Sequence, residues 1–180
     1  MFSLKVDNEI ALGLLEQRHA QPLLDLTVQS REHLREWMPV LGNQKTVQET
    51  ENFIKSGLKR FSENNGFQVG IWYKGELAGT IGYKYWDWAT RQTELVYWLG
   101  QPYTGHGIMT RTTRKMVEYA FGELGLNRVE IRCATGNLPS RAVPERLGFT
   151  QEGILRQVFW RNDHFLDLAV YSMLANEWAI

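Results

Sequence analysis

The chain has 180 residues, 43% of them apolar and 22% charged, and its 20 basic residues balance 20 acidic ones. Eight Phe, seven Tyr and seven Trp provide the apolar surface that one folded domain needs and exclude an intrinsically disordered chain. A net charge of zero excludes the broad basic field of an unspecific nucleic-acid binder, so we expect no direct contact with nucleic acid.

The N-terminal third predicts one strand followed by helices. Ile10–Glu16 is a short apolar run that predicts a strand. Residues 18–37 predict a helical stretch, which Pro39 and Gly42 close. A second helix is predicted over residues 46–63, because apolar residues recur there at helical spacing and an Asn-Asn-Gly sequence follows.

The middle of the chain changes to the two-residue period of strands. Residues 67–73, 77–86 and 92–99 are rich in aromatic and β-branched residues, which predicts three strands of an antiparallel meander. Lys74-Gly75-Glu76 supplies a tight turn between the first two strands. Residues 108–124 then present one apolar face at helical spacing, up to a glycine that ends the predicted helix.

The C-terminal part predicts three more strands and one short helix. Residues 128–135 alternate apolar and polar side chains, as a strand does. Residues 139–147 predict a short helix, and residues 149–160 and 165–174 predict the last two strands. No linker or repeat divides the sequence. We therefore predict a single domain over residues 1–180 of the α/β (α+β) class, with a mixed, mostly antiparallel sheet of about seven strands flanked by helices.

Signals for export and membrane insertion are missing from the sequence. The longest apolar runs fall far short of the about 18 residues that a membrane span needs. The first ten residues carry Lys5, Asp7 and Glu9 instead of the hydrophobic run of a signal peptide. The single cysteine, Cys133, cannot form an internal disulfide. We therefore expect a cytoplasmic protein with no membrane partner.

The segment Gly100–Thr110 (GQPYTGHGIMT) combines three glycines with the start of a helix. Glycines let a backbone approach a ligand closely, and the unpaired N–H groups of a first helical turn bind anions. A P-loop would need Lys and then Ser or Thr where His106 and Gly107 stand. A dinucleotide fingerprint would need Gly or Ala in place of Thr110 and an acidic residue about twenty positions later, where the next strand ends in Ala-Thr-Gly. The segment therefore predicts a phosphate-binding loop that is neither a P-loop nor a dinucleotide fingerprint. Motifs elsewhere in the chain indicate which family of loop it is.

Several motifs follow one another in order along residues 94–172. They are Glu94-Leu-Val-Tyr-Trp-Leu99 on a strand, Pro102-Tyr-x-Gly105-x-Gly107 at the next helix, Asn127-Arg-x-Glu130, Asn137-x-x-Ser140-x-x-Val143, Leu147-Gly148-Phe149, Glu152-Gly153 and Asp167-x-x-x-Tyr171-Ser172, with Trp37 and Pro39 upstream. In these motifs the whole chain resembles the GCN5-related N-acetyltransferase (GNAT) superfamily. Within it the chain is most similar to the RimJ/RimL type of bacterial enzyme, which acetylates the N-termini of ribosomal proteins.

The resemblance implies an acetyl-CoA-dependent N-acetyltransferase in which an acceptor amine attacks the thioester directly. That reaction needs a deprotonated amine, a stabilised oxyanion and a neutralised thiolate. At pH 7 an α-amine with a pKa near 7.8 costs about 1 kcal/mol to deprotonate, whereas a lysine with a pKa near 10.4 costs about 4 to 5 kcal/mol. The favoured acceptor is therefore the N-terminal α-amine of a ribosomal protein. A small amine acceptor, such as a polyamine or an aminoglycoside, and a non-catalytic CoA-binding module stay open as alternatives.

The resemblance assigns catalytic roles to two residues. Glu94 is the candidate base, acting through water, because it lies on the strand that pairs with the pantetheine arm in the family. The alternative for Glu94 is a structural carboxylate paired with a cation such as Arg91 or Arg132. Ser140 is the candidate hydrogen-bond donor to the departing sulfur, and its alternative is an ordinary serine in the first turn of a helix.

The resemblance also implies a cofactor site. Asn137 corresponds to the residue whose amide meets the pantetheine, against the alternative of a plain turn residue. Main-chain contacts are expected from the end of one strand and the start of the next helix, at Tyr97, Trp98, Leu99, Gly105, His106, Gly107, Ile108, Met109 and Thr110. We expect the side chains of the strand residues to lie in the core and that of His106 to project into solvent.

The other reactive and aromatic residues predict less. Cys133 shares the apolar side of its strand with Val129 and Ile131, so we expect it to be buried rather than to carry an acetyl group. The four histidines have no partners at ligand spacing, so no metal is expected. The remaining aromatic candidates would line the acceptor cleft, with the core or a homodimer surface as the alternatives, and they are Trp37, Tyr85, Trp86 and Trp88.

Overall fold

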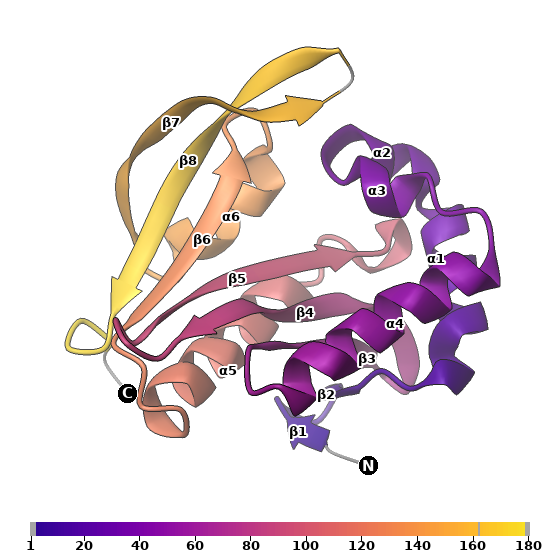
Figure 1. Ribbon diagram of the computed structural model, residues 1–180, viewed down its shortest axis with the longest axis horizontal. Coiled ribbons are helices and arrows are strands. Elements are labelled where there is room, and N and C mark those ends of the chain that lie inside the picture. Colours follow the sequence, from indigo (N-terminus) through magenta and orange to yellow (C-terminus); the bar gives the residue numbers. More distant parts are fainter. Residues whose placement is uncertain (1–2, 162, 179–180) are drawn as a thin grey trace.

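One sheet of eight strands organises the computed structural model, which describes residues 3–161 and 163–178 (Figure 1). The strands are β1 Ser3–Lys5, β2 Ile10–Leu14, β3 Phe67–Tyr73, β4 Glu76–Asp87, β5 Gln92–Leu99, β6 Arg128–Ala134, β7 Thr150–Arg161 and β8 His164–Leu174. Their order in the sheet is β1-β2-β3-β4-β5-β6-β8-β7. Every neighbouring pair is antiparallel except β5 and β6. The predicted fold class, with its meander of β3, β4 and β5, is confirmed.

The predicted count of about seven strands is one too low, and β1 is the additional strand. Ser3 pairs with Gly13 of β2, and the two strands run antiparallel. Three residues are too few to show an alternating pattern, so pairing with β2 rather than the local sequence makes this strand. β2 itself ends at Leu14, two residues earlier than predicted, because Glu16 already caps the next turn and its N–H donates to Nδ1 of His19 at 2.9 Å.

The helices are α1 Ala20–Gln29, α2 Arg31–Trp37, α3 Pro39–Gly42, α4 Val47–Ser62, α5 Ile108–Gly122 and α6 Leu138–Arg146, with 3₁₀ turns η1 Gln17–His19 and η2 Gln101–Tyr103. The predicted helical stretch over residues 18–37 is divided at Ser30 into α1 and α2; α2 ends before Pro39, which opens the further helical turn α3. Ser30 is fully buried, and its hydroxyl accepts a hydrogen bond from the N–H of Gln101 at 2.9 Å. A tertiary contact thus fixes Ser30 at the break. None of the helices in the described residues is long and apolar enough to cross a bilayer.

Helices cover both faces of the sheet: α1 and α4 lie on one face and α5 on the other (Figure 1). Successive side chains of a strand point to opposite faces, so β5 contributes to two apolar clusters. Trp98 belongs to the cluster that includes Leu23 of α1. Leu95 belongs to the cluster that includes Met116 of α5. By the same alternation Glu94 shares the α1/α4 face with Trp98.

A network of charged side chains ties the two outer strands to β6. Nη1 and Nη2 of Arg128 on β6 donate to the two carboxylate oxygens of Glu152 on β7 at 2.6 and 2.7 Å. The hydroxyl of Ser172 on β8 donates to the same carboxylate at 2.7 Å. These hydrogen bonds, those from Arg128 first, lower the pKa of Glu152 from its usual 4.5 to about 2. The ionised carboxylate therefore stabilises the joining of β6, β8 and β7.

Replacing Glu152 with glutamine is expected to destabilise the fold by about 1 kcal/mol at pH 7, a discounted value because the side chain is 43% exposed. The pKa of Glu152 is lower in the folded state than in the unfolded state. The variant's loss in free energy of unfolding is therefore complete above about pH 4.5 and disappears as the pH falls towards about 2. Urea unfolding of both proteins across this pH range measures the difference. Glu118→Gln, which removes a partly buried pair with Lys115, is the control. A loss of stability that stays constant with pH would contradict the role given to Glu152.

Candidate functional site

β5 and β6 run side by side for only part of their length and then diverge (Figure 1). Register pairs join the two strands up to Leu95 and Ile131, whereas β5 stays paired with β4 as far as Leu99. Among the described strands, none pairs with the β6 side of residues 96–99. An extended ligand with amide groups can add to such an open strand edge, as peptides do.

The chain leaves β5 through a glycine-bearing loop and begins α5 beside this open edge. Gly105 and Gly107 have φ of 81° and 69°, which glycine adopts without strain, and Gly107 is the N-cap of α5. The first intrahelical hydrogen bond runs from the N–H of Arg111 to the carbonyl of Gly107 at 3.1 Å. Within residues 3–161 and 163–178, no group accepts a hydrogen bond from the N–H groups of residues 105–110. A row of free donors therefore stands at the positive end of the helix dipole.

Open space lies beside these donors. A Cβ placed on Gly105 or on Gly107 would meet no atom within 4 Å. The side chains of Ile108 and Met109 are buried, so at these positions α5 offers only its backbone. His106 is exposed, as expected, and its Nδ1 lies 2.9 Å from a carbonyl oxygen of the loop. Main-chain donors, an open approach and a helix N-terminus together have the chemistry of a phosphate cradle.

Glu94 lies on the α1/α4 face of β5, one residue before the last register pair with β6. Its side chain is buried, and Nζ of Lys84 on β4 lies 3.3 and 3.2 Å from its two carboxylate oxygens. Nε of Arg132 is 4.0 Å away and bonds more closely to Glu130, at 2.5 Å. Of the two cations expected beside Glu94, only Arg132 lies within ion-pair distance in the described residues, and Glu130 is its main partner. Arg91 instead donates to a carbonyl at the end of α5.

Tyr97 lies on the opposite face of β5 and reaches across to α6. Its hydroxyl donates to the carbonyl oxygen of Ser140 at 3.0 Å, and Oγ of Ser140 donates to Sγ of Cys133 at 3.2 Å. Burial raises the pKa of the Cys133 thiol, and it raises the pKa of the Tyr97 phenol well above the usual value, so both groups stay protonated near pH 7. The expected burial of Cys133 is confirmed. Because a thiol is a weak acceptor, the Ser140 hydroxyl can turn to a stronger one.

Asn137 is the N-cap of α6. Its Oδ1 accepts a hydrogen bond from the N–H of Ser140 at 3.2 Å, which is the turn role considered for Asn137 and places Ser140 in the first turn. Within the described chain, Nδ2 of the same amide makes no hydrogen bond, so its donors stay available. The side chains of Tyr97, Trp98 and Leu99 pack in the two apolar clusters, as expected, which leaves the main chain of β5 to face a ligand.

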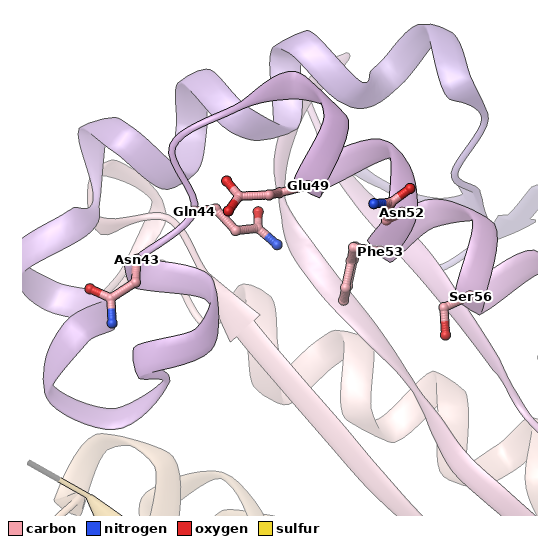
Figure 2. Close-up of a pocket in the computed structure, with 6 residues that line it drawn as sticks. All are labelled: Asn43, Gln44, Glu49, Asn52, Phe53 and Ser56. Carbon is pink, nitrogen blue, oxygen red and sulfur yellow. The ribbon is translucent and has the colours of Figure 1, made fainter.

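A surface pocket of about 450 Å³ lies elsewhere, where the chain enters α4 (Figure 2). The pocket is lined by Asn43, Gln44, Glu49, Asn52, Phe53 and Ser56. The carboxylate of Glu49 accepts from the N–H groups of Lys45 and Thr46, so this polar side chain serves to start the helix. None of the candidate residues lines this pocket. In the described part of the chain, no cluster of three or more His, Cys, Asp or Glu side chains is arranged to hold a metal ion.

Residues 10–150 match the family described as the acetyltransferase (GNAT) domain. The chain belongs to the GNAT acetyltransferase family. Among its relatives is YdaF of Bacillus subtilis (strain 168), which is provisionally named a ribosomal N-acetyltransferase. The two proteins are 38% identical over 99% of this chain and 98% of YdaF. The resemblance drawn from the sequence motifs is therefore confirmed.

Solved structures share the fold of this GNAT acetyltransferase. The microcin C7 self-immunity acetyltransferase MccE, in complex with acetyl-CoA and AMP, superposes with a TM-score of 0.91 at 27% identity and covers 95% of each chain. RimL, a ribosomal L7/L12 α-N-protein acetyltransferase in complex with CoA, superposes with a TM-score of 0.93 over 98% of this chain and 99% of its own. Because RimL is only 20% identical to this chain, the similarity between the two shows a shared fold and nothing more.

The closest partner of Glu94 in this GNAT acetyltransferase, Lys84, was not predicted from the sequence. Lys84 faces Glu94 because it continues the register in which Tyr83 of β4 pairs with Leu95 of β5. The register between two strands depends on how they pair and leaves no mark in either strand's own pattern. The one signal available was the meander itself, which makes β4 the neighbour of β5.

Proposed function

We propose that this protein transfers the acetyl group of acetyl-CoA to the N-terminal α-amine of a protein, with a ribosomal protein as the favoured acceptor. The observation that carries the proposal is the open edge of β5, which leads directly to the unpaired N–H groups at the start of α5. The names of YdaF and RimL support an N-terminal acceptor on a ribosomal protein. The zero net charge of the chain gives no reason to invoke RNA contacts.

The residues present fit acetyl-CoA. The backbone of residues 105–110 would hold the diphosphate, since its donors are free and the space beside Gly105 and Gly107 is open. The main chain of residues 96–99 and the free amide donors of Asn137 would hold the pantetheine, which has amide groups of its own. Bound acetyl-CoA supplies an activated acyl carbon with a good leaving group.

Glu94 of β5 and Ser140 of α6 lie on opposite faces of the sheet. This placement suits a displacement in which one residue serves the attacking amine and the other serves the leaving sulfur. Glu94 would take a proton from the α-ammonium group through water and pass it to solvent. The nitrogen lone pair then forms the C–N bond while the C–S bond breaks, with its electron pair going to sulfur. Ser140 would donate a hydrogen bond to that sulfur, and the second amine proton ends there, so that CoA leaves as the thiol.

Incubation with ribosomal proteins and isotopically labelled acetyl-CoA tests the acceptor. Mass spectrometry is expected to find the label on a protein N-terminus. A peptide with a free α-amine is expected to react faster than the same peptide with a blocked N-terminus and a free lysine, because the α-amine is the easier to deprotonate. Transfer only to a polyamine or an aminoglycoside would contradict the protein acceptor. No transfer to any amine would contradict the proposed activity.

A further inference from the structure

Arg161, the last residue of β7, has two buried donor atoms without an acceptor among the described residues. Its Nε and Nη1 are buried, and within the described residues neither has an acceptor. Buried donors are nearly always paired in folded proteins, and leaving a charged one unpaired is costly. Arg161 is therefore better explained by a ligand that completes its hydrogen bonds than by a contact within the fold.

Trp37 of α2 holds the guanidinium in place. Cζ of Arg161 lies 5.1 Å from the centre of the Trp37 ring, a cation–π distance. The same indole lies against the turn after β6, because a Cβ built on Gly136 would be 3.3 Å from its Cη2. Figure 1 shows the end of the β7–β8 hairpin approaching α2 and α3. Trp37 thus connects Arg161 to the residue that precedes Asn137, beside the divergence of β5 and β6.

A bulge in β7 directs the hairpin towards α2. Residues 156–158 stand opposite Asp167 alone, because the register with β8 shifts between Leu155 and Phe159. Gln157 adopts a φ of 54°, and its N–H donates to Oδ1 of Asp167 at 2.8 Å. Bulges bend the strand that carries them, and the hairpin curves in Figure 1. Asp167 is accordingly a positioning residue for Arg161.

We propose that Arg161 determines acceptor specificity by binding a carboxylate of the acceptor polypeptide, from an Asp or Glu near its N-terminus. The proposal rests on the proposed function, because it requires a polypeptide whose first residue lies at the divergence of β5 and β6. Arginine pairs with carboxylates in a planar fork and stacks on aromatic rings while doing so, which is how Arg161 already lies on Trp37. An extended acceptor advances by about 3.3 Å per residue, so only one or two peptide positions reach Arg161.

Paired peptides that differ only in Asp or Asn, placed in turn at positions two to five, test this specificity. Wild type is expected to show a kcat/KM roughly ten- to hundredfold higher for Asp at the favoured position, the range of hydrogen bonds between charged groups. Arg161→Gln is expected to abolish the preference by slowing the Asp peptide alone, and its unchanged rate with the Asn peptide shows that the variant is folded. Arg161→Lys is expected to keep part of the preference. The control Arg156→Gln, at an exposed arginine of the same strand, is expected to keep all of it.

Three outcomes overturn the inference. Equal rates for Asp and Asn peptides in wild type would remove it and leave N-terminal acetylation standing. A preference that survives in Arg161→Gln would place the carboxylate elsewhere. No acetylation of either peptide would overturn both the inference and the proposed function. Asp167→Ala is expected to weaken the preference, whereas Asp167→Asn, which keeps the Oδ1 acceptor for Gln157, is expected to retain it.

Discussion

Replacing Glu94 with glutamine is expected to lower kcat by about 10²- to 10⁴-fold while the Kd for CoA stays nearly unchanged, the range measured for general acid–base residues. The amide has the same shape and can accept a hydrogen bond, but it cannot take the proton of an ammonium group. The carboxylate lies at the last paired positions of β5 and β6 rather than along the open edge, so its loss should not disturb cofactor contacts. Steady-state kinetics and calorimetric titration of CoA measure the two quantities.

Glu130→Gln is the matched control for this variant. Glu130 is the register partner of Glu94 on β6, points to the same face and is comparably buried, but its carboxylate is held by Arg128 and Arg132. We expect this change to affect stability more than turnover. If Glu94→Gln and Glu130→Gln lowered kcat equally, the effect would belong to the ion-pair network. An unchanged kcat in Glu94→Gln would mean that another group accepts the proton.

Gly107→Val is expected to weaken CoA binding roughly 100-fold, as two hydrogen bonds to a charged group, each worth about 1.5 kcal/mol, would be lost. The new side chain would occupy the open space beside the free N–H groups of residues 105–110. A β-branched residue at a φ of 69° also costs stability, so the loss of binding must be separated from a loss of folding.

The other end of α5 provides that separation. Gly125 has a φ of 61°, and a Cβ there would also meet no atom within 4 Å. Gly125→Val therefore imposes a similar backbone strain in the turn just after the same helix, far along the chain from the free donors. We expect both variants to lose comparable stability in urea unfolding and only Gly107→Val to lose CoA affinity. Undiminished CoA binding in Gly107→Val would contradict the backbone cradle.

Local patterns predicted most of the sheet. Aromatic and β-branched residues predict β3, β4 and β5. One apolar face between two glycines at positive φ predicts α5. These features are recorded in consecutive residues, so they follow from the sequence. The break at Ser30 does not, because it depends on a hydroxyl that accepts a hydrogen bond from Gln101, 71 residues later.

The candidate site divides in the same way. The free donors of α5 follow from two glycines and a helix start, and the burial of Cys133 follows from strand alternation. The contacts of Lys84 with Glu94 and of Arg161 with Trp37 do not follow, since the first depends on the register between β4 and β5 and the second on the bulge in β7. Residue types at functional positions are therefore more predictable here than the partners that orient them.

A crystal structure of the protein with CoA tests the central claim most directly. We predict that the diphosphate oxygens lie within hydrogen-bond distance of the N–H groups of residues 105–110, with the pantetheine alongside residues 96–99 between β5 and β6. CoA bound at another surface, with the N-terminus of α5 left empty, would contradict this account.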